Sequence, residues 1–225
     1  TKGEACEDAV NVLTELGVVT GYEDGSYKPE NIVTRAEMAV LIINALGLDS
    51  YIADQKSNFT DMSGYSWAEP YIAYAQSLGF INGYGDGTFR PGNTVSYDEA
   101  ATMLVGALGY TPECLPGNWP ANFVTKAKSL GVLDDILSSV GGANRGDIAI
   151  MIFNTLDQWI GYVDKDGVFQ MYTDKSGSDS SPNDNMLLRL GAKEYNDGKY
   201  FIMTSDIADE ALVNVREYIG AAVKA

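Results

Sequence analysis

The sequence contains 225 residues, of which 45% are hydrophobic and 20% are charged, so its composition is that of a folded globular protein. This length suits one large domain or two modest ones. A net charge of −16 excludes a surface that attracts nucleic acid or anionic lipid by general electrostatics. Because histidine is absent, the chain lacks the commonest general base and the commonest transition-metal ligand, which disfavours an enzyme.

No hydrophobic stretch reaches the ~18 residues that a transmembrane helix needs, and the first residues lack the basic and then apolar pattern of a signal segment. We therefore expect a soluble chain without membrane insertion. Cys6 and Cys114 cannot complete a zinc site without histidine. They are either buried thiols or one disulfide, and their separation in the sequence does not decide between the two.

The chain contains an internal repeat. Residues 17–25, GVVTGYEDG, match residues 79–87, GFINGYGDG, and the same offset is kept as far as the Ala-Leu-Gly sequence that ends each copy. A third, degenerate copy begins at residues 129–133, SLGVL, loses the Tyr-x-Asp-Gly loop, and continues at residues 144–147, NRGD. Matches at fixed spacing indicate three copies of one structural unit.

Each copy predicts a helix, a loop and a second helix. In the second copy, apolar residues with helical spacing over 67–78 end at Gly79, and further glycine and proline residues then force turns. Thr34, Ser96 and Asn144 are predicted N-caps of the second helices, each followed three residues later by an acidic residue. One copy cannot bury its own apolar stripe, so we expect the three copies to pack together around shared helices.

The residues from about 161 onward have a different character. Residues 162–169 predict a β-hairpin with an Asp-Gly turn, and residues 200–204 predict another strand. A polar loop at 176–185 separates them, and residues 207–223 have helical spacing. The Asp-x-Asp-Gly sequence of the hairpin also resembles the start of a calcium loop, but its fifth position is valine and no glutamate closes it, which favours a turn. We expect a small, separate α+β element, or the beginning of a larger unit that is truncated here.

Together these patterns resemble the S-layer homology family. They include Phe59-Thr60-Asp61, a tryptophan-bearing helix, LGFINGYGDGTFRP at residues 78–91, and Thr-Arg-Ala-Glu before a helix that ends in Ala-Leu-Gly. The resemblance covers about residues 4–158 and leaves the tail unexplained. It implies a mainly α fold, in which three helix-loop-helix repeats form a pseudo-trimer around a central helical bundle, followed by the small α+β C-terminal element. The corresponding boundaries are residues 1–50, 57–112, 115–160 and 161–225.

Membership of this family further implies a non-catalytic module that anchors an exported protein on the bacterial cell surface. The implied partner is a secondary cell wall polysaccharide, a peptidoglycan-linked glycan that often carries pyruvate ketals. The implied molecule is a monomer with internal pseudo-threefold symmetry, and no cofactor is expected. The alternative is a structural or assembly module of a surface protein, with degenerate repeats that no longer bind glycan.

The residues themselves indicate where an anion could bind. A helix N-terminus exposes unpaired N–H groups, and an arginine beside it adds a planar fork that suits a carboxylate. Arg35 and Arg145 stand at this position in the first and third copies, whereas Tyr97 replaces the arginine in the second. The ordinary alternative is an exposed surface arginine, whose loss would change stability by about 0.5 kcal/mol.

Three further residues complete the candidate site. Trp67 and Trp119 occupy equivalent positions in the second and third copies, where the first copy has Ala5. If pockets form between neighbouring copies, either ring could complete the site of Arg35 and stack on a sugar face; helix packing near the axis is the alternative. Asp61 could orient the arginine, accept a sugar hydroxyl or cap a helix. The candidate ligand-binding set is Arg35, Arg145, Asp61, Trp67, Trp119 and Tyr97.

Overall fold

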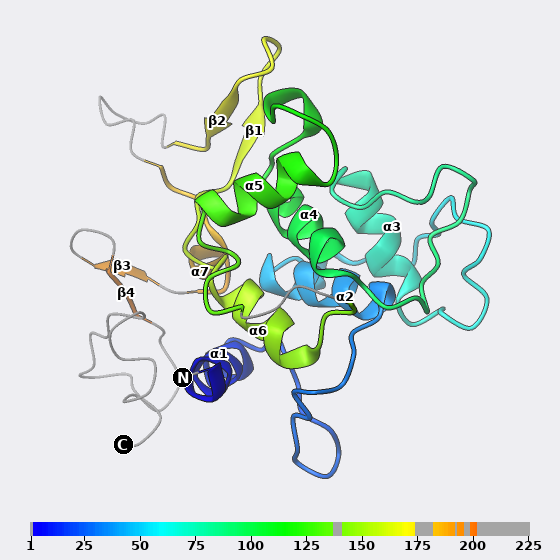
Figure 1. The fold of residues 1–225 in the computed structure, drawn as a ribbon, viewed down its shortest axis with the longest axis vertical. Helices are drawn as coiled ribbons and strands as arrows, with labels where there is room; N and C mark the ends of the chain where they lie inside the picture. Colours follow the sequence, from blue (N-terminus) through cyan, green and yellow to red (C-terminus); the bar gives the residue numbers. More distant parts are fainter. Residues whose placement is uncertain (1, 137–140, 174–181, 192, 196–198, 202–225) are drawn as a thin grey trace.

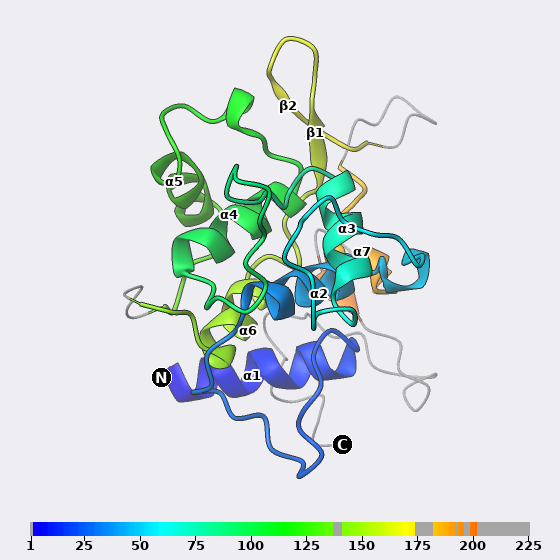
Figure 2. The same ribbon diagram turned by 90° about the vertical axis from the view of Figure 1, so that its right-hand side faces the viewer.

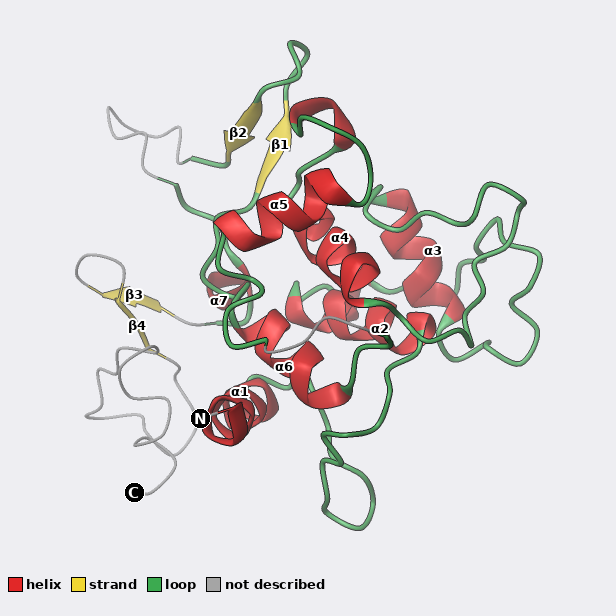
Figure 3. Cartoon of the chain, in the orientation of Figure 1, coloured by secondary structure: helices red, strands yellow, loops and turns green. Residues whose placement is uncertain are grey.

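The computed structural model describes residues 2–136, 141–173, 182–191, 193–195 and 199–201, and these residues form the fold in Figure 1. Helices are its main elements, and the strands in this part of the chain all follow residue 160 (Figure 3). The prediction of a mainly α fold is therefore confirmed. The helix predicted at residues 207–223 lies outside the described residues.

Each of the three copies contributes two helices. The first helices are α1 (Lys2–Glu15), α3 (Glu69–Ser77) and α5 (Ala121–Ser129). The second helices are α2 (Arg35–Ala45), α4 (Tyr97–Ala107) and α6 (Arg145–Phe153). Short 3-10 helices at Asp49–Tyr51 and Pro112–Cys114 follow α2 and α4. The helix-loop-helix pattern predicted for each copy is confirmed.

The N-caps of the second helices also agree with the prediction. The hydroxyl of Thr34 accepts from the N–H of Glu37, and the carboxylate of Glu37 accepts from the N–H of Thr34 in return. Ser96 forms the same reciprocal pair in α4, and the Asn144 side chain accepts from the third N–H of α6. These caps satisfy N–H groups that the first turn of a helix cannot pair internally, so each helix starts at a defined residue.

The most extensive helix contacts connect different copies. Helix α2 packs on α3, α4 packs on α5, and α6 packs on α1, so each second helix lies against the first helix of another copy (Figures 1 and 2). The apolar faces of α2, α4 and α6 lie in one continuous buried core. This arrangement agrees with the prediction that one copy cannot cover its own apolar stripe.

Three backbone hydrogen bonds join the copies just before the second helices. The N–H of Val33 donates to the carbonyl of Ala143 at 2.9 Å, that of Ala143 to Val95 at 2.9 Å, and that of Val95 to Val33 at 3.0 Å. These bonds close a ring through one buried residue of each copy. Because each N-cap follows directly in the chain, the ring positions the start of all three second helices.

The tail contains short elements. Strands β1 (Gly161–Val163) and β2 (Phe169–Met171) pair in antiparallel fashion, which confirms the predicted hairpin. Strands β3 (Lys193–Tyr195) and β4 (Lys199–Phe201) form a second pair, and β4 overlaps the strand predicted at 200–204. The sequence analysis missed helix α7 (Met186–Arg189), a single turn that is too short for a periodic pattern.

The expectation that the tail is separate from the repeats is wrong for residues 161–173 and 182–190. Met186 is fully buried in the same core as the repeat helices. The N–H of Gly161 donates to the carbonyl of Leu108, which ends α4, at 3.0 Å. A Cβ at Gly109 would lie 2.0 Å from the carbonyl oxygen of Gly161, so this close approach requires glycine. A change in local sequence period does not reveal such contacts between distant segments.

The two cysteines are not joined. Cys6 lies in α1 and Cys114 in the 3-10 helix after α4, and the structure contains no disulfide between them. The thiol of Cys114 donates to the carbonyl of Thr111 at 3.2 Å. Of the two alternatives that the sequence left open, the structure has thiols, both partly buried.

Candidate functional site

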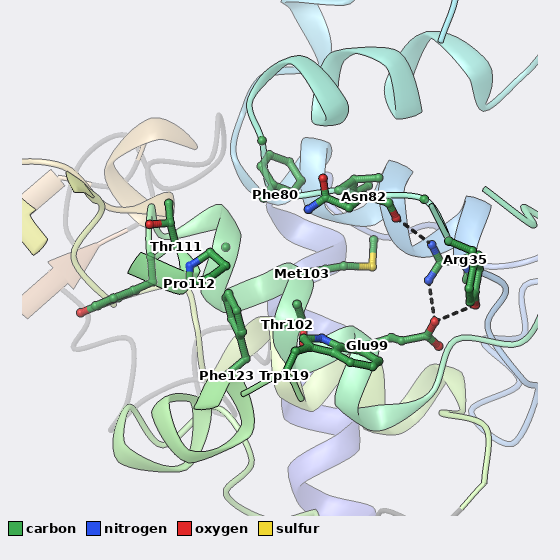
Figure 4. A pocket seen from close by; sticks show the side chains of 16 residues that line it. Arg35, Phe80, Asn82, Glu99, Thr102, Met103, Thr111, Pro112, Trp119 and Phe123 are labelled. Carbon is green, nitrogen blue, oxygen red and sulfur yellow. Dashed lines mark hydrogen bonds and ion pairs between the residues drawn. The ribbon is translucent and has the colours of Figure 1, made fainter. Parts of the chain in front are cut away.

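A pocket of about 470 Å³ lies against α4 and α5 (Figure 4). At one end it is lined by Arg35, Asn82 and Glu99, and its wall includes the aromatic ring of Trp119 and, at the other end, Pro112. Its lining therefore comes from all three copies, since Arg35 belongs to the first and Trp119 to the third. We call this site the Arg35 pocket.

Arg35 is the first residue of α2 and reaches into the second copy. Its Nε donates to the carbonyl of Phe89 at 2.9 Å, its Nη1 to Oε1 of Glu99 at 2.7 Å, and its Nη2 to the carbonyl of Asn82 at 3.3 Å. The guanidinium carbon also lies 4.8 Å from the centre of the Tyr84 ring. Arg35 is only 6% exposed. The alternative of an exposed surface arginine is therefore wrong here, because the loop of the next copy folds over the side chain.

Glu99 is the carboxylate that faces Arg35. Its Oε1 also accepts from the hydroxyl of Tyr84 at 2.9 Å, and its Oε2 accepts from the N–H of Ser96 at 2.9 Å. Burial raises the pKa of Glu99, but the hydrogen bonds from Ser96 and Tyr84 and the charge of Arg35 outweigh burial, so the net pKa lies below its ordinary value. Glu99 is thus ionised at neutral pH and neutralises Arg35.

Arg145 makes the corresponding backbone contacts in the first copy. Its Nε donates to the carbonyl of Tyr27 at 3.0 Å, and its Nη2 donates to the carbonyl of Thr20 at 3.1 Å. The rings of Tyr27 and Tyr22 lie near the guanidinium carbon, at 4.5 and 5.1 Å. Arg145 is half-buried, so the exposed-arginine alternative does not describe it well either.

The charge environment of Arg145 differs from that of Arg35. Glu37 is the repeat equivalent of Glu99, and its Oε2 caps α2 as that of Glu99 caps α4, accepting from the N–H and the hydroxyl of Thr34 at 2.7 and 2.8 Å. Unlike Glu99, Glu37 forms no hydrogen bond with the arginine of the neighbouring copy among the described residues. Within the described part of the chain, no carboxylate forms an ion pair with Arg145. Arg145 therefore keeps a net positive charge at its site, whereas Arg35 does not.

Tyr97 occupies the third equivalent position. Its side chain is 5% exposed, and its hydroxyl donates to Oδ2 of Asp147 in the third copy. Burial and the hydrogen bond to the Asp147 carboxylate raise the pKa of Tyr97 well above its ordinary value, so the phenol stays neutral. The Tyr97–Asp147 pair links copies two and three as Arg35–Glu99 links copies one and two. Ligand contact by Tyr97 stays a prediction.

The two tryptophans are on the surface. Trp119 is 59% exposed, lines the Arg35 pocket, and donates from Nε1 to the hydroxyl of Thr102 at 3.0 Å. Trp67 is 52% exposed and is not among the residues that line this pocket. The alternative of helix packing near the axis is wrong for both, because their rings face solvent. Of the two, the structure brings Trp119 to Arg35.

Asp61 organises the loop that receives Arg35. Its Oδ1 accepts from the N–H of Phe89 at 2.9 Å, and its Oδ2 accepts from the N–H of Arg90 at 2.7 Å. Arg90 has a φ of 56°, a left-handed conformation that these bonds help to hold. Asp61 thus caps no helix, but it orients Arg35 indirectly, since the carbonyl of Phe89 accepts from Nε of Arg35.

A model of the S-layer homology domain matches residues 1–39 and 58–101 of the chain. The chain belongs to the S-layer homology family. The matched segments lie in the first two copies, and the third copy lies outside them.

Relatives in this family are cell-surface proteins and an enzyme. "Middle cell wall protein" of Brevibacillus brevis is 37% identical over 152 residues, which cover 67% of this chain and 14% of that protein. "Cellulosome-anchoring protein" of Acetivibrio thermocellus is 40% identical over 107 residues, or 46% of this chain and 24% of that protein. "Amylopullulanase" of Thermoanaerobacterium thermosulfurigenes is 26% identical over 175 residues, which cover 70% of this chain and 9% of that protein. The chain therefore spans a small part of the length of each relative.

Sequence reasoning missed several residues of the site in these S-layer homology repeats. Glu99 was assigned only a capping role, although its second oxygen faces Arg35. Asn82 and Tyr84 lie in the loop that the repeat match detected, but nothing local showed that this loop covers an arginine from another copy. Tyr110, which lines the pocket, stacks on Phe169 of the tail hairpin with ring centres 3.8 Å apart.

Among the described residues, no three or more Cys, Asp or Glu side chains gather in a way that could hold a metal ion. No helix in the same part of the chain is long and apolar enough to cross a bilayer.

Proposed function

We propose that this chain is a non-catalytic module that anchors a surface protein on the bacterial envelope by binding a secondary cell wall polysaccharide. The Arg35 pocket is the observation that carries this proposal. It combines aromatic rings such as Trp119 and Phe123, on which a sugar face can stack, with hydrogen-bonding groups at one end. Two relatives support the same role and an extracellular location: one is named as a cell wall protein and the other as a cellulosome-anchoring protein.

The repeats give this module its shape. We propose that residues 1–50, 57–112 and 115–160 are three repeats that form a pseudo-trimer around α2, α4 and α6, within one monomer. The closed ring of hydrogen bonds through Val33, Val95 and Ala143 supports this symmetry, as does the packing of each second helix on another copy. Residues 161–225 follow as the C-terminal region, of which the described part up to residue 190 packs on the repeats.

The acidic substituent of the glycan, a pyruvate ketal, is proposed to bind at Arg145. This arginine stands at the N-terminus of α6, and its positive charge has no ion-pair partner among the described residues. The expected unpaired N–H groups are not present at this helix N-terminus, because those of Arg145 and Gly146 donate to the carbonyls of Asn31 and Pro29. The guanidinium is therefore the group proposed to meet the carboxylate. Trp67 is the repeat equivalent of Trp119 and is proposed to supply the aromatic surface there.

The remaining candidate residues are proposed to act indirectly. Asp61 fixes the loop that receives Arg35, and Tyr97 closes the third position through Asp147. The Tyr97–Asp147 pair supports the alternative function in part, because at this repeat interface a tyrosine hydrogen-bonded to a buried carboxylate stands where the other copies have an arginine. A module in which all three positions serve assembly alone would bind no wall glycan.

Co-sedimentation with purified wall sacculi tests the proposal. We expect the full chain to pellet with intact sacculi and to stay in solution after the polysaccharide is extracted. Trp119→Ala should weaken pelleting at least about fivefold, because truncation of an aromatic residue that anchors a ligand costs more than about 1 kcal/mol. Tyr51→Ala is the matched control, since Tyr51 is exposed but does not line the pocket. Equal pelleting before and after extraction would contradict glycan binding.

A further inference from the structure

We infer that Glu99 makes the Arg35 pocket selective for a neutral sugar, so that Arg35 does not serve as the receptor for an acidic group. The inference rests on the proposed function, since it assigns a ligand class to one of the two arginine sites. It follows from the ion pair inside the pocket, from the groups that are left for a ligand, and from the contrast with Arg145.

The ion pair already occupies Arg35. Nη1 lies 2.7 Å from Oε1 of Glu99, and both side chains are largely buried, with 7% and 16% of the side chain exposed. Opposite charges this close, in a site of reduced dielectric, attract each other strongly and leave little net charge. A ligand carboxylate that approached Arg35 would also approach Glu99, and like charges at short range repel each other. The pocket therefore offers an acidic group no net attraction.

The hydrogen bonds around the pair hold it in place. The hydroxyl of Tyr84 donates to the same Oε1 that meets Arg35, and the N–H of Ser96 holds Oε2. The Nε and Nη2 groups of Arg35 are bound to backbone carbonyls. Glu99 thus cannot swing away from Arg35 without losing contacts on both oxygens. Displacement by a ligand carboxylate would have to replace all of them.

The groups of the pocket that are left to bind a ligand are uncharged. The side-chain amide of Asn82 lines the pocket and has no hydrogen-bond partner among the described residues, so it can donate to and accept from sugar hydroxyls. Trp119 presents an exposed ring at the opposite side of the pocket. Amide and aromatic groups of this kind suit an uncharged pyranose, which has polar edges and apolar faces.

In the first copy the equivalent carboxylate, Glu37, forms no ion pair with Arg145 among the described residues. The hydroxyl of Tyr22, equivalent to Tyr84, accepts from the side chain of Asn31 at 3.0 Å and forms no hydrogen bond with Glu37. One oxygen of Glu37 caps α2 through Thr34, as the equivalent oxygen of Glu99 caps α4 through Ser96. The two arginines therefore divide the ligand between them: a neutral sugar in the Arg35 pocket and an acidic substituent at Arg145.

Calorimetry on the full chain tests this division, with a pyruvylated wall fragment and the same fragment after depyruvylation as probes. Glu99→Gln removes the charge but keeps an oxygen for Arg35 and Tyr84. We expect it to raise affinity for the pyruvylated fragment roughly tenfold and to change affinity for the depyruvylated fragment less than about threefold, because the freed guanidinium can then make a charge-assisted pair. Glu37→Gln is the matched control and should produce no such gain.

The possible results distinguish failure of the inference about Glu99 from failure of the proposed glycan binding. If folded Glu99→Gln shows no gain in preference for the pyruvylated fragment, the inference is wrong and the proposed function stands. Should Glu99→Gln not fold, Trp119→Ala decides, because its exposed ring is not needed for the core: equal loss of affinity for both fragments supports the inference, and selective loss for the pyruvylated one overturns it. Failure of the natural chain to bind either fragment overturns the proposed function and this inference together.

Discussion

Arg35 and Arg145 occupy equivalent positions of the repeat, and their backbone contacts correspond residue by residue. Nε of Arg35 donates to the carbonyl of Phe89, and Nε of Arg145 donates to the carbonyl of the equivalent residue, Tyr27. Nη2 of each arginine donates to a second carbonyl of the same loop. They differ in charge environment, since only Arg35 has an ion pair with the equivalent glutamate among the described residues. The repeat thus keeps the position of the arginine and changes its charge environment.

The two copies also differ at the tyrosine of the loop. Tyr84 donates to the oxygen of Glu99 that faces Arg35, whereas Tyr22 accepts from Asn31 and forms no hydrogen bond with Glu37. Both glutamates cap their helices through the other oxygen, so the cap does not account for the difference. The hydrogen bond of the loop tyrosine to the glutamate accompanies the ion pair in the second copy.

The largest expected effect is on stability at the two arginines. Arg35→Ala leaves the Glu99 charge buried without its partner, so we expect a loss of about 3 kcal/mol in the free energy of unfolding. Arg145→Ala removes hydrogen bonds to carbonyls without stranding a carboxylate, and we expect about 1 kcal/mol. Urea denaturation of both variants measures the difference. Equal losses would mean that the Arg35–Glu99 pair adds nothing beyond the shared backbone contacts.

The third equivalent position extends the comparison. Tyr97→Phe removes the hydroxyl that donates to the buried carboxylate of Asp147, and we expect a loss of about 2 kcal/mol. The ring itself stays, so packing changes little. Thermal and urea unfolding check this value. A loss below about 0.5 kcal/mol would show that the Tyr97–Asp147 pair does not hold copies two and three together.

A smaller effect is expected at the loop tyrosines. Tyr84→Phe removes the hydroxyl that orients Glu99 and should lower the free energy of unfolding by about 1 kcal/mol. Tyr22→Phe removes an exposed hydrogen bond to Asn31 and should cost about 0.5 kcal/mol or less. The two substitutions are chemically identical, so the difference in urea midpoint reports the role of Glu99. A larger loss at Tyr22 would reverse the proposed contrast.

Part of this picture could be predicted from the sequence. Capping residues such as Thr34 and Ser96 were predictable because the cap involves residues only three apart in the chain. The position of Arg35 followed from the repeat as well. Its burial did not, because the loop that covers it and the carboxylate of Glu99 belong to another copy, and a local pattern carries no information on that contact.

The tail shows the same limit. The hairpin β1–β2 was predictable from its alternating residues and Asp-Gly turn, yet its packing on the end of α4 was not. Helix α7 is a single turn without a periodic signal. A glycine after each of α2 and α4 was assigned only a role in ending a helix, although Gly109 also admits the tail backbone. Local sequence patterns predicted the secondary-structure elements, but not how these elements pack on one another.

The smallest expected effect concerns pH. In the folded chain the pKa of Glu99 lies below its ordinary value of 4.5, so its contribution to stability is complete above that pH and is lost as pH falls through the folded pKa. The stability difference between the natural chain and Glu99→Gln should therefore be constant from pH 7 to about 5 and shrink below about 4.5. Urea denaturation across this range measures it. A difference that grows as pH falls would contradict the sign of the pKa shift.

Calorimetry of Arg145→Ala with the pyruvylated and depyruvylated wall fragments tests most directly whether the acidic group binds at Arg145. We expect the natural chain to prefer the pyruvylated fragment by about tenfold or more, and Arg145→Ala to bind both fragments with the same affinity, because only the neutral-sugar pocket at Arg35 remains. If Arg145→Ala keeps the full preference for the pyruvylated fragment, the acidic group binds at Arg35 and the claimed division of roles between the two arginines is contradicted.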